Sequence, residues 1–168
     1  MQLQSSQSVI EPIAEHRAPS GSMPQQVLVP IHRMCDLEAA LKHVSLLARP
    51  CEVRIVVLHV LAFPNNRSAP VQPHSAEELM EQAESLLGAS RIDYETHIVA
   101  GELAFSIFDA AEQLACKLIV MPLLNNRPWH SFFPTSTVRD MLRTQRDVPV
   151  VFVDALGQAI KGMSHEPA

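Results

Sequence analysis

The chain has 168 residues, 47% of them hydrophobic and 18% charged, which is enough for one folded domain with tails and too apolar for a wholly disordered protein. Its net charge of −5 is spread along the sequence, which argues against DNA, RNA or an anionic membrane as the main partner, because phosphate binding requires a basic surface. Cys35, Cys51 and Cys116 form no C-x-x-C pair, so neither a disulfide framework nor a zinc ribbon is indicated and a cytoplasmic location is expected.

The first 25 residues carry Glu11 and Glu15 and lack the basic segment and apolar run of a secretory signal. We interpret residues 1–25 as a flexible arm. The longest apolar stretch, residues 55–63, is well below the roughly 18 residues that indicate a membrane-spanning helix. No membrane segment is therefore expected.

From residue 26 onward, short apolar runs alternate with segments of helical periodicity, which is typical of βαβ units and a parallel sheet. The first strand is expected at 27–31, with Pro30 near its end because proline cannot donate to a ladder. Asp36 is expected to cap the helix that follows. Residues 52–60 are β-branched and almost continuously apolar, as in a strand covered on both faces. The loop at 61–74 has no readable role.

The second half of the chain continues this alternation. Ser75 begins a capping box that opens a second helix, and the alternating pattern of 92–99 predicts a half-exposed edge strand. Gly101 and Glu102 precede a third helix. The remaining expected elements are a strand at 117–121, a fourth helix starting near Ser136 in another capping box, a closing strand at 148–153 and a flexible tail at 155–168.

Right-handed crossovers leave few arrangements for five parallel strands. We expect a single α/β domain, residues 26–154, with a doubly wound five-stranded parallel sheet of order 3-2-1-4-5 and helices on both faces. Strands 1 and 4 are then neighbours, and doubly wound sheets bind ligands beside such a switch point. Residues 32–35 and 122–137 should form the site, and the helix start near Ser136 favours an anionic ligand. The hydroxyls of 135–137 would either cap that helix or bind the ligand.

The strands carry a family resemblance. VLVPI, VVLHV, the Gly101-Glu102 helix start, LIVMP and STV followed by VPVVFV occur in the order seen in universal stress proteins, and residues 26–154 resemble that family. Its ATP-binding members have an aspartate closing the first strand and a G-x-x-G-x9-G-[ST] loop. Here His32 stands in place of the aspartate, Pro122 in place of the first glycine, Asn125 or Asn126 near the second, and Ser136-Thr137 in place of the final Gly-[ST].

The resemblance implies an adenine nucleotide alpha hydrolase-like fold and a nucleotide site. Glycine lets the backbone approach phosphate, whereas proline also removes an N–H donor. Losing two charge-assisted hydrogen bonds weakens affinity by roughly two to four orders of magnitude, so we expect weak or absent binding, with ATP or AMP as the candidate ligand. The residues implied for this site are Pro30, Ile31, His32, Val60, Met121, Pro122, Asn125, Asn126, Arg127, Thr135, Ser136 and Thr137.

Other chemistry is less favoured. His32 and Cys35 could supply two metal ligands, but the sequence places no third, so no metal site is expected. No G-x-S-x-G motif marks a nucleophile, and Cys116 is expected to pack near the core. His59 and His97 are interpreted as hydrogen-bonded core imidazoles rather than general bases. No catalytic residue is therefore assigned, although slow ATP hydrolysis stays open.

The last strand would leave an apolar ladder exposed at a sheet edge, which a second copy could cover. The family resemblance implies the same pairing, so a homodimer is expected through Val150, Val151, Phe152 and Val153. The leading function is that of a non-catalytic regulatory or stress-response protein that contacts protein partners. The rival is an ATP- or AMP-binding universal stress protein with a modified phosphate loop. A nucleotide-dependent transferase ranks last, because its phosphate-binding motifs are missing from the sequence.

Overall fold

The computed structural model describes residues 10, 12–16, 25–49, 52–62, 73–123 and 148–160. The expected fourth helix near Ser136 lies outside these residues. The described elements are β1 (Ala14–His16), β2 (Gln25–Pro30), α1 (Met34–Leu47), β3 (Val53–Ala62), α2 (Pro73–Ala89), β4 (Asp93–Gly101), α3 (Leu103–Gln113), β5 (Leu118–Pro122) and β6 (Val150–Val153).

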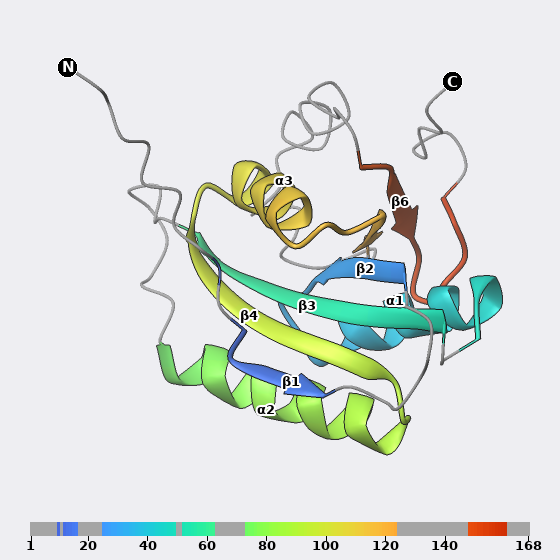
Figure 1. Cartoon of the computed structure of the whole chain (residues 1–168), viewed down its shortest axis with the longest axis horizontal. Coiled ribbons are helices and arrows are strands. Elements are labelled where there is room, and N and C mark those ends of the chain that lie inside the picture. The colour runs from blue at the N-terminus through green and yellow to red at the C-terminus, as the bar shows by residue number, and fades with distance from the viewer. Residues whose placement is uncertain are drawn as a thin grey trace.

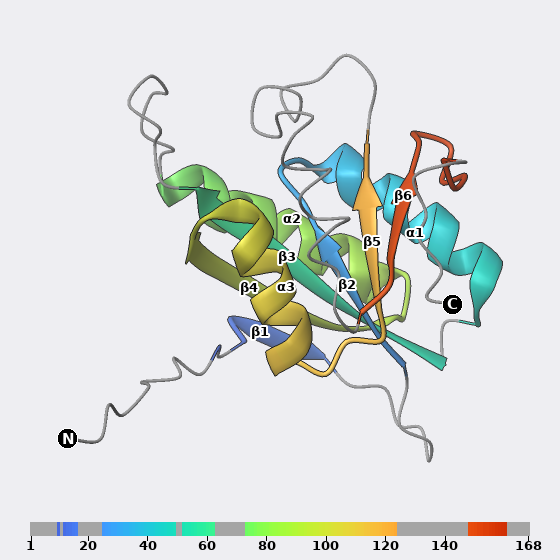
Figure 2. The same cartoon turned by 90° about the horizontal axis from the view of Figure 1, so that it is seen from above.

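The strands form one sheet of six, in the order β1-β4-β3-β2-β5-β6. From β4 to β6 every neighbouring pair is parallel, and these five strands stand in the order expected from the sequence (Figure 2). The predicted doubly wound α/β sheet is therefore confirmed, with one strand more than expected.

The additional strand, β1, comes from the segment expected to be a flexible arm. It runs antiparallel to β4 with Glu15 opposite Glu95, and the Ile13 amide donates to the Thr96 carbonyl at 2.7 Å. Consequently β4 is an inner strand, and the expectation of an edge strand there was wrong. The three residues of β1 are too few to show an apolar periodicity. Backbone pairing and an ion pair of Glu15 hold them, and pattern reading does not detect either.

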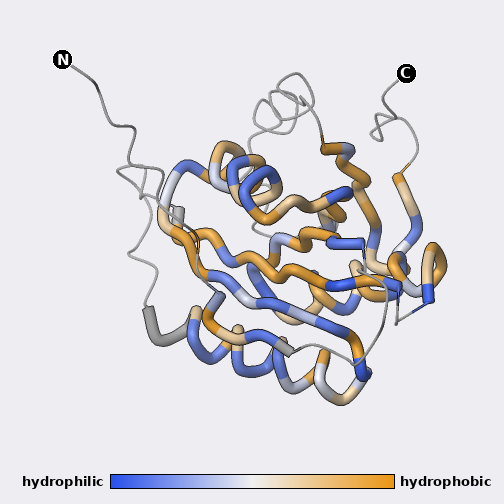
Figure 3. Tube along the Cα trace, in the orientation of Figure 1, coloured by the Kyte–Doolittle hydropathy of each residue, from blue (hydrophilic) through white to orange (hydrophobic). Residues whose placement is uncertain are grey.

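Helices cover both faces of the sheet (Figure 1). α1 and α2 pack on one face around a buried cluster that includes Leu37 and Val57, whereas α3 packs on the other around Leu58 and Ile107. Successive residues of β3 are thus buried on opposite faces, which explains its continuous apolar sequence. Figure 3 shows this strand mostly in hydrophobic colours, while hydrophilic and hydrophobic stretches alternate along α2. Within the described ranges, no helix has the length and apolar character that a bilayer crossing requires.

Two helix starts differ from expectation. α1 begins at Met34 with Arg33 as N-cap, so Asp36 is the third helical residue and not the cap. α2 begins at Pro73, two residues before Ser75, because proline is well suited to the first helical position. The start of α3 is as expected, since Glu102 is its N-cap and accepts the amides of the second and third helical residues.

Residues 154–160, nearly all expected to belong to a flexible tail, fold back along β6. The Gly157 amide donates to the Asp154 carbonyl at 2.9 Å, and the Ile160 amide donates to the Phe152 carbonyl at 2.9 Å. The tail interpretation was therefore wrong for this segment. An aspartate at the first position of a turn and a glycine at the fourth fix it, and Ile160 packs against the cluster on the α3 face.

The same segment changes the environment of β6. Val150, Phe152 and Val153 are buried and Val151 is partly buried, so the strand does not leave the exposed apolar ladder that the sequence suggested. The reason is that its side chains enter the clusters on both sheet faces and the chain after it returns along its outer edge. Pairing with a second copy is thus not required to bury these side chains.

Candidate functional site

The carboxyl ends of β2 and β5 lie at the same end of the sheet. The two strands pair in parallel, with Val27 opposite Leu118 and Leu28 opposite Ile119, and they run side by side in Figure 2. Their ladder, as seen in the described residues, stops after these two pairs. The neighbouring positions of β2 and β5 give the switch-point arrangement expected from the strand order.

The structure describes part of the expected nucleotide site. Pro30 and Ile31 are buried at the end of β2, and Met121 and Pro122 are buried at the end of β5. Val60 packs against the cluster on the α3 face, which includes Met121, whereas Ile31 belongs to the cluster on the other face. The following expected residues lie outside the described ranges: Asn125, Asn126, Arg127, Thr135, Ser136 and Thr137.

The buried carboxylate of Asp36 organises the turn between β2 and α1. Its Oδ2 accepts the amide N–H groups of His32 and Arg33, each at 2.9 Å. An acidic side chain one turn into a helix that reaches back to the N-cap amide is one half of a capping box. Asp36 thereby fixes the backbone that carries His32 and Arg33 at the end of β2, a role larger than the helix cap expected for it.

His32 stacks on His59, with ring centroids 5.8 Å apart and an interplanar angle of 21°. The Nδ1 atom of His59 lies 2.9 Å from the Ile31 carbonyl oxygen, and since that oxygen only accepts, Nδ1 carries the hydrogen. His59 is buried, so its interpretation as a hydrogen-bonded core imidazole is confirmed. The His59 imidazole therefore links β3 to Ile31, directly after β2, and stacks against the His32 ring.

The His32 imidazole should make folding stability depend on pH. Desolvation, and next the charge of His59, lower the pKa of His32 from 6.5; Arg33 adds to this lowering and Asp36 opposes it. The unfolded chain therefore binds the proton at higher pH than the folded chain, and stability falls as the pH drops below 6.5. Urea titrations between about pH 7.5 and about pH 5.5 should show a smaller decline for His32→Asn than for wild type. Equal declines would contradict this assignment.

Arg33 lies within the range 32–35 that was expected to border the site, but no role was predicted for its side chain. Its Nε and Nη2 atoms are buried and have no hydrogen-bond partner among the residues that the structure describes. A guanidinium is well suited to phosphate or carboxylate, because its planar donors match their oxygens. The signal available in the sequence was a cation directly after His32, at the end of the first predicted strand.

Nucleophile and metal chemistry find little support in the described residues. Burial first, and the charge of Glu95 second, raise the pKa of the Cys116 thiol to about 12, so it is protonated at neutral pH and a poor nucleophile. The described residues contain no group of three His, Cys, Asp or Glu side chains that could hold a metal ion, whereas a structural zinc site takes four ligands.

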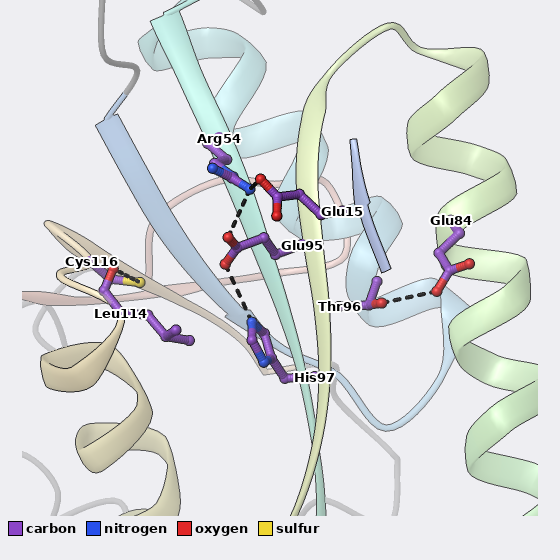
Figure 4. A network of polar contacts seen from close by, with 8 residues as sticks. All are labelled: Glu15, Arg54, Glu84, Glu95, Thr96, His97, Leu114 and Cys116. Atoms are coloured by element: carbon purple, nitrogen blue, oxygen red, sulfur yellow. Dashed lines mark hydrogen bonds and ion pairs between the residues drawn. The ribbon is translucent and has the colours of Figure 1, made fainter. Parts of the chain in front are cut away.

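A second polar cluster, which was not predicted from the sequence, lies in the sheet near Cys116 (Figure 4). Arg54 Nη2 is 2.6 Å from Glu15 Oε1 and 2.7 Å from Glu95 Oε1, and His97 Nε2 is 3.3 Å from Glu95 Oε2. Arg54 and His97 are buried, which confirms His97 as a hydrogen-bonded interior imidazole. Because these residues come from β1, β3 and β4, the cluster fastens the amino-terminal strand to the sheet.

Comparison with known proteins gives one family. The model of the universal stress protein family matches residues 23–153, while no curated relative matches the sequence. A universal stress protein from Lactobacillus plantarum is 20% identical, with a TM-score of 0.54 over 79% of this chain and 99% of that one. A family protein from Arabidopsis thaliana with AMP bound is 14% identical, with a TM-score of 0.55 over 78% and 91%. One from Archaeoglobus fulgidus in complex with dAMP is 18% identical, with a TM-score of 0.53 over 78% and 98%. At these identities the likeness of the solved structures shows the fold alone.

Proposed function

Because the chain belongs to the universal stress protein family, we propose that it is a non-catalytic regulatory protein of that family whose nucleotide site binds ATP weakly or not at all. The observation that carries this proposal is the pair of residues at the two strand ends. His32 lies two residues after the end of β2, and Pro122 is the last residue of β5; both are at the switch point, where a phosphate group would need donors and free space.

Both residues oppose phosphate binding. Pro122 has no N–H to offer and its ring occupies space beside the backbone, where a glycine would leave room. The His32 ring is held against His59, and its lowered pKa keeps it neutral at pH 7, so it supplies neither the carboxylate of ATP-binding members nor a positive charge. The high pKa of Cys116 supports the non-catalytic part of the proposal.

Calorimetric titration tests the weak site. We expect Mg-ATP and AMP to bind wild type roughly two to four orders of magnitude more weakly than a micromolar site. Pro122→Gly should tighten binding at least about tenfold, since it regains one donor to a charged group. Pro12→Gly is the matched control, because Pro12 is exposed and outside both strand ends, and it should leave the affinity unchanged.

A low-micromolar dissociation constant in wild type would contradict the proposal and favour a second candidate, an AMP- or ATP-binding protein with a modified phosphate loop. Two observations favour that candidate. The buried guanidinium atoms of Arg33 have no partner in the described residues, and structural relatives carry AMP or dAMP. In that case Arg33→Gln should abolish most of the measured nucleotide affinity. Any slow ATP hydrolysis would require Arg33 as well.

The assembly and location form the last part of the proposal. We place the protein in the cytoplasm, in keeping with the free thiols of Cys35 and Cys116. We further propose that two copies pair through the outer edge of β6 and that the dimer contacts protein partners rather than nucleic acid or membrane, in keeping with the net charge of −5.

A further inference from the structure

The outer edge of β6 is partly occupied by the chain itself. We call residues 154–160 the strap. Its Ile160 amide donates to the Phe152 carbonyl at 2.9 Å, and the Asp154 amide donates to the Gln158 carbonyl at 3.0 Å. These two bonds form an isolated antiparallel bridge. The strap thus takes the position of a neighbouring antiparallel strand, beside β6 in Figures 1 and 2.

The strap is fastened to α1 through backbone carbonyls. His43 Nδ1 lies 2.8 Å from the Gly157 oxygen, and Lys42 Nζ donates to the Ala155 oxygen at 3.3 Å. Within the strap, Asp154 Oδ1 accepts the amides of the residues two and four positions later, at 2.9 and 3.0 Å. Side-chain hydrogen bonds therefore help to hold this segment. Ile160, at its end, packs against the buried cluster on the α3 face, whereas Leu156 is exposed.

Gly157 is the point where the strap touches the helix. Its φ is +78°, and an added Cβ would lie 2.6 Å from the Lys42 Cβ and 2.8 Å from the His43 amide nitrogen. A side chain at this position is therefore excluded both by backbone conformation and by contact with helix backbone. Any substitution of Gly157 should lift the strap from α1.

We propose that the strap is an intramolecular gate that controls whether a second copy of this chain pairs with β6. The strap covers only the second half of the strand, by one bridge. Because outward-facing backbone groups alternate along a strand, those of Val150 face the same outer edge as those of Phe152, and among the described residues only the strap bonds to that edge. Two β6 strands lying antiparallel would satisfy both halves at once, and such an isologous contact is self-complementary. The inference rests on the proposed pairing through β6.

Light scattering and sedimentation of the full chain test the gate. We expect wild type to dimerise weakly, and Gly157→Ala to lower the dimer dissociation constant at least about tenfold, since the left-handed conformation alone disfavours alanine by about that factor. Asp154→Ala, which removes two bonds inside the strap, should act in the same direction and serves if Gly157→Ala does not fold. Gly88→Ala is the matched control, because an added Cβ there meets nothing within 4 Å.

Amide hydrogen exchange reports the strap independently of the dimer. At a concentration where all variants are monomeric, the Ile160 amide should exchange about tenfold faster in Gly157→Ala than in wild type. Faster exchange without tighter dimerisation would contradict the gate. The proposed pairing through β6 would then be judged by whether wild type forms dimers in light scattering. Dimers of equal strength in wild type and variants would also overturn the gate. If wild type and all variants are monomeric, the proposed pairing through β6 is contradicted as well. None of these results bears on nucleotide affinity.

Discussion

Replacing Arg54 with methionine should lower the free energy of unfolding by about 3–5 kcal/mol, the range for removing one partner of a buried ion pair. Arg54 is buried and contacts the carboxylates of Glu15 and Glu95 at 2.6 and 2.7 Å. Methionine keeps much of the length of the side chain but leaves Glu95, whose side chain is only 14% exposed, without its cation. Urea unfolding at neutral pH followed by circular dichroism measures the effect.

Glu15→Gln is the comparison on the other side of the same cation. The Glu15 side chain is 44% exposed, so its loss should cost about 0.2–1 kcal/mol, as for surface ion pairs. The double variant Arg54→Met/Glu95→Gln should regain a large part of the stability lost in Arg54→Met, because no buried charge is then uncompensated. If Arg54→Met unfolds like wild type, the cluster does not fasten β1 to the sheet.

The parallel strands were predictable because their side chains carry the pattern. β3 is almost continuously apolar since both of its faces are covered. The alternation in β4 arises because one face, with Tyr94 and Ile98, packs toward α2, while the other carries Glu95 and His97. Strand order then followed from crossover handedness. The position of the candidate site came with it, because only the order decides that β2 and β5 are neighbours.

The features that the sequence did not predict are held by individual contacts, which produce no periodic pattern of apolar residues. β1 depends on pairing with β4 and on the ion pair between Glu15 and Arg54. These two residues are 39 positions apart in the sequence, so no local pattern joins them. The strap depends on Asp154 and Gly157, a turn signature that was overshadowed by the low apolar content around it. The buried Nε and Nη2 atoms of Arg33, which have no hydrogen-bond partner within the described part of the chain, depend on how the turn after β2 folds, and a linear pattern does not specify this.

The turn between β2 and α1 should contribute a similarly large share of the stability. Asp36→Ala should lower the free energy of unfolding by about 3 kcal/mol, because the amides of His32 and Arg33 lose a charged acceptor worth about 1.5–3 kcal/mol for each bond, partly offset by water. Asp36→Asn keeps a neutral acceptor oxygen and should cost about half as much. Glu38→Ala, an exposed position on the same helix, should stay within about 0.5 kcal/mol of wild type.

The same variants separate stability from site geometry. If Asp36 positions the end of β2, Asp36→Ala should also flatten the decline in stability between about pH 7 and about pH 5.5, because a released His32 loses the burial that lowers its pKa. Asp36→Asn should keep that decline or steepen it, since its amide oxygen still accepts the two backbone N–H groups and the carboxylate charge that raises the pKa of His32 is gone. A loss of stability in Asp36→Ala with an unchanged pH profile would mean that the carboxylate only caps α1, and that the rings of His32 and His59 hold the strand end without it.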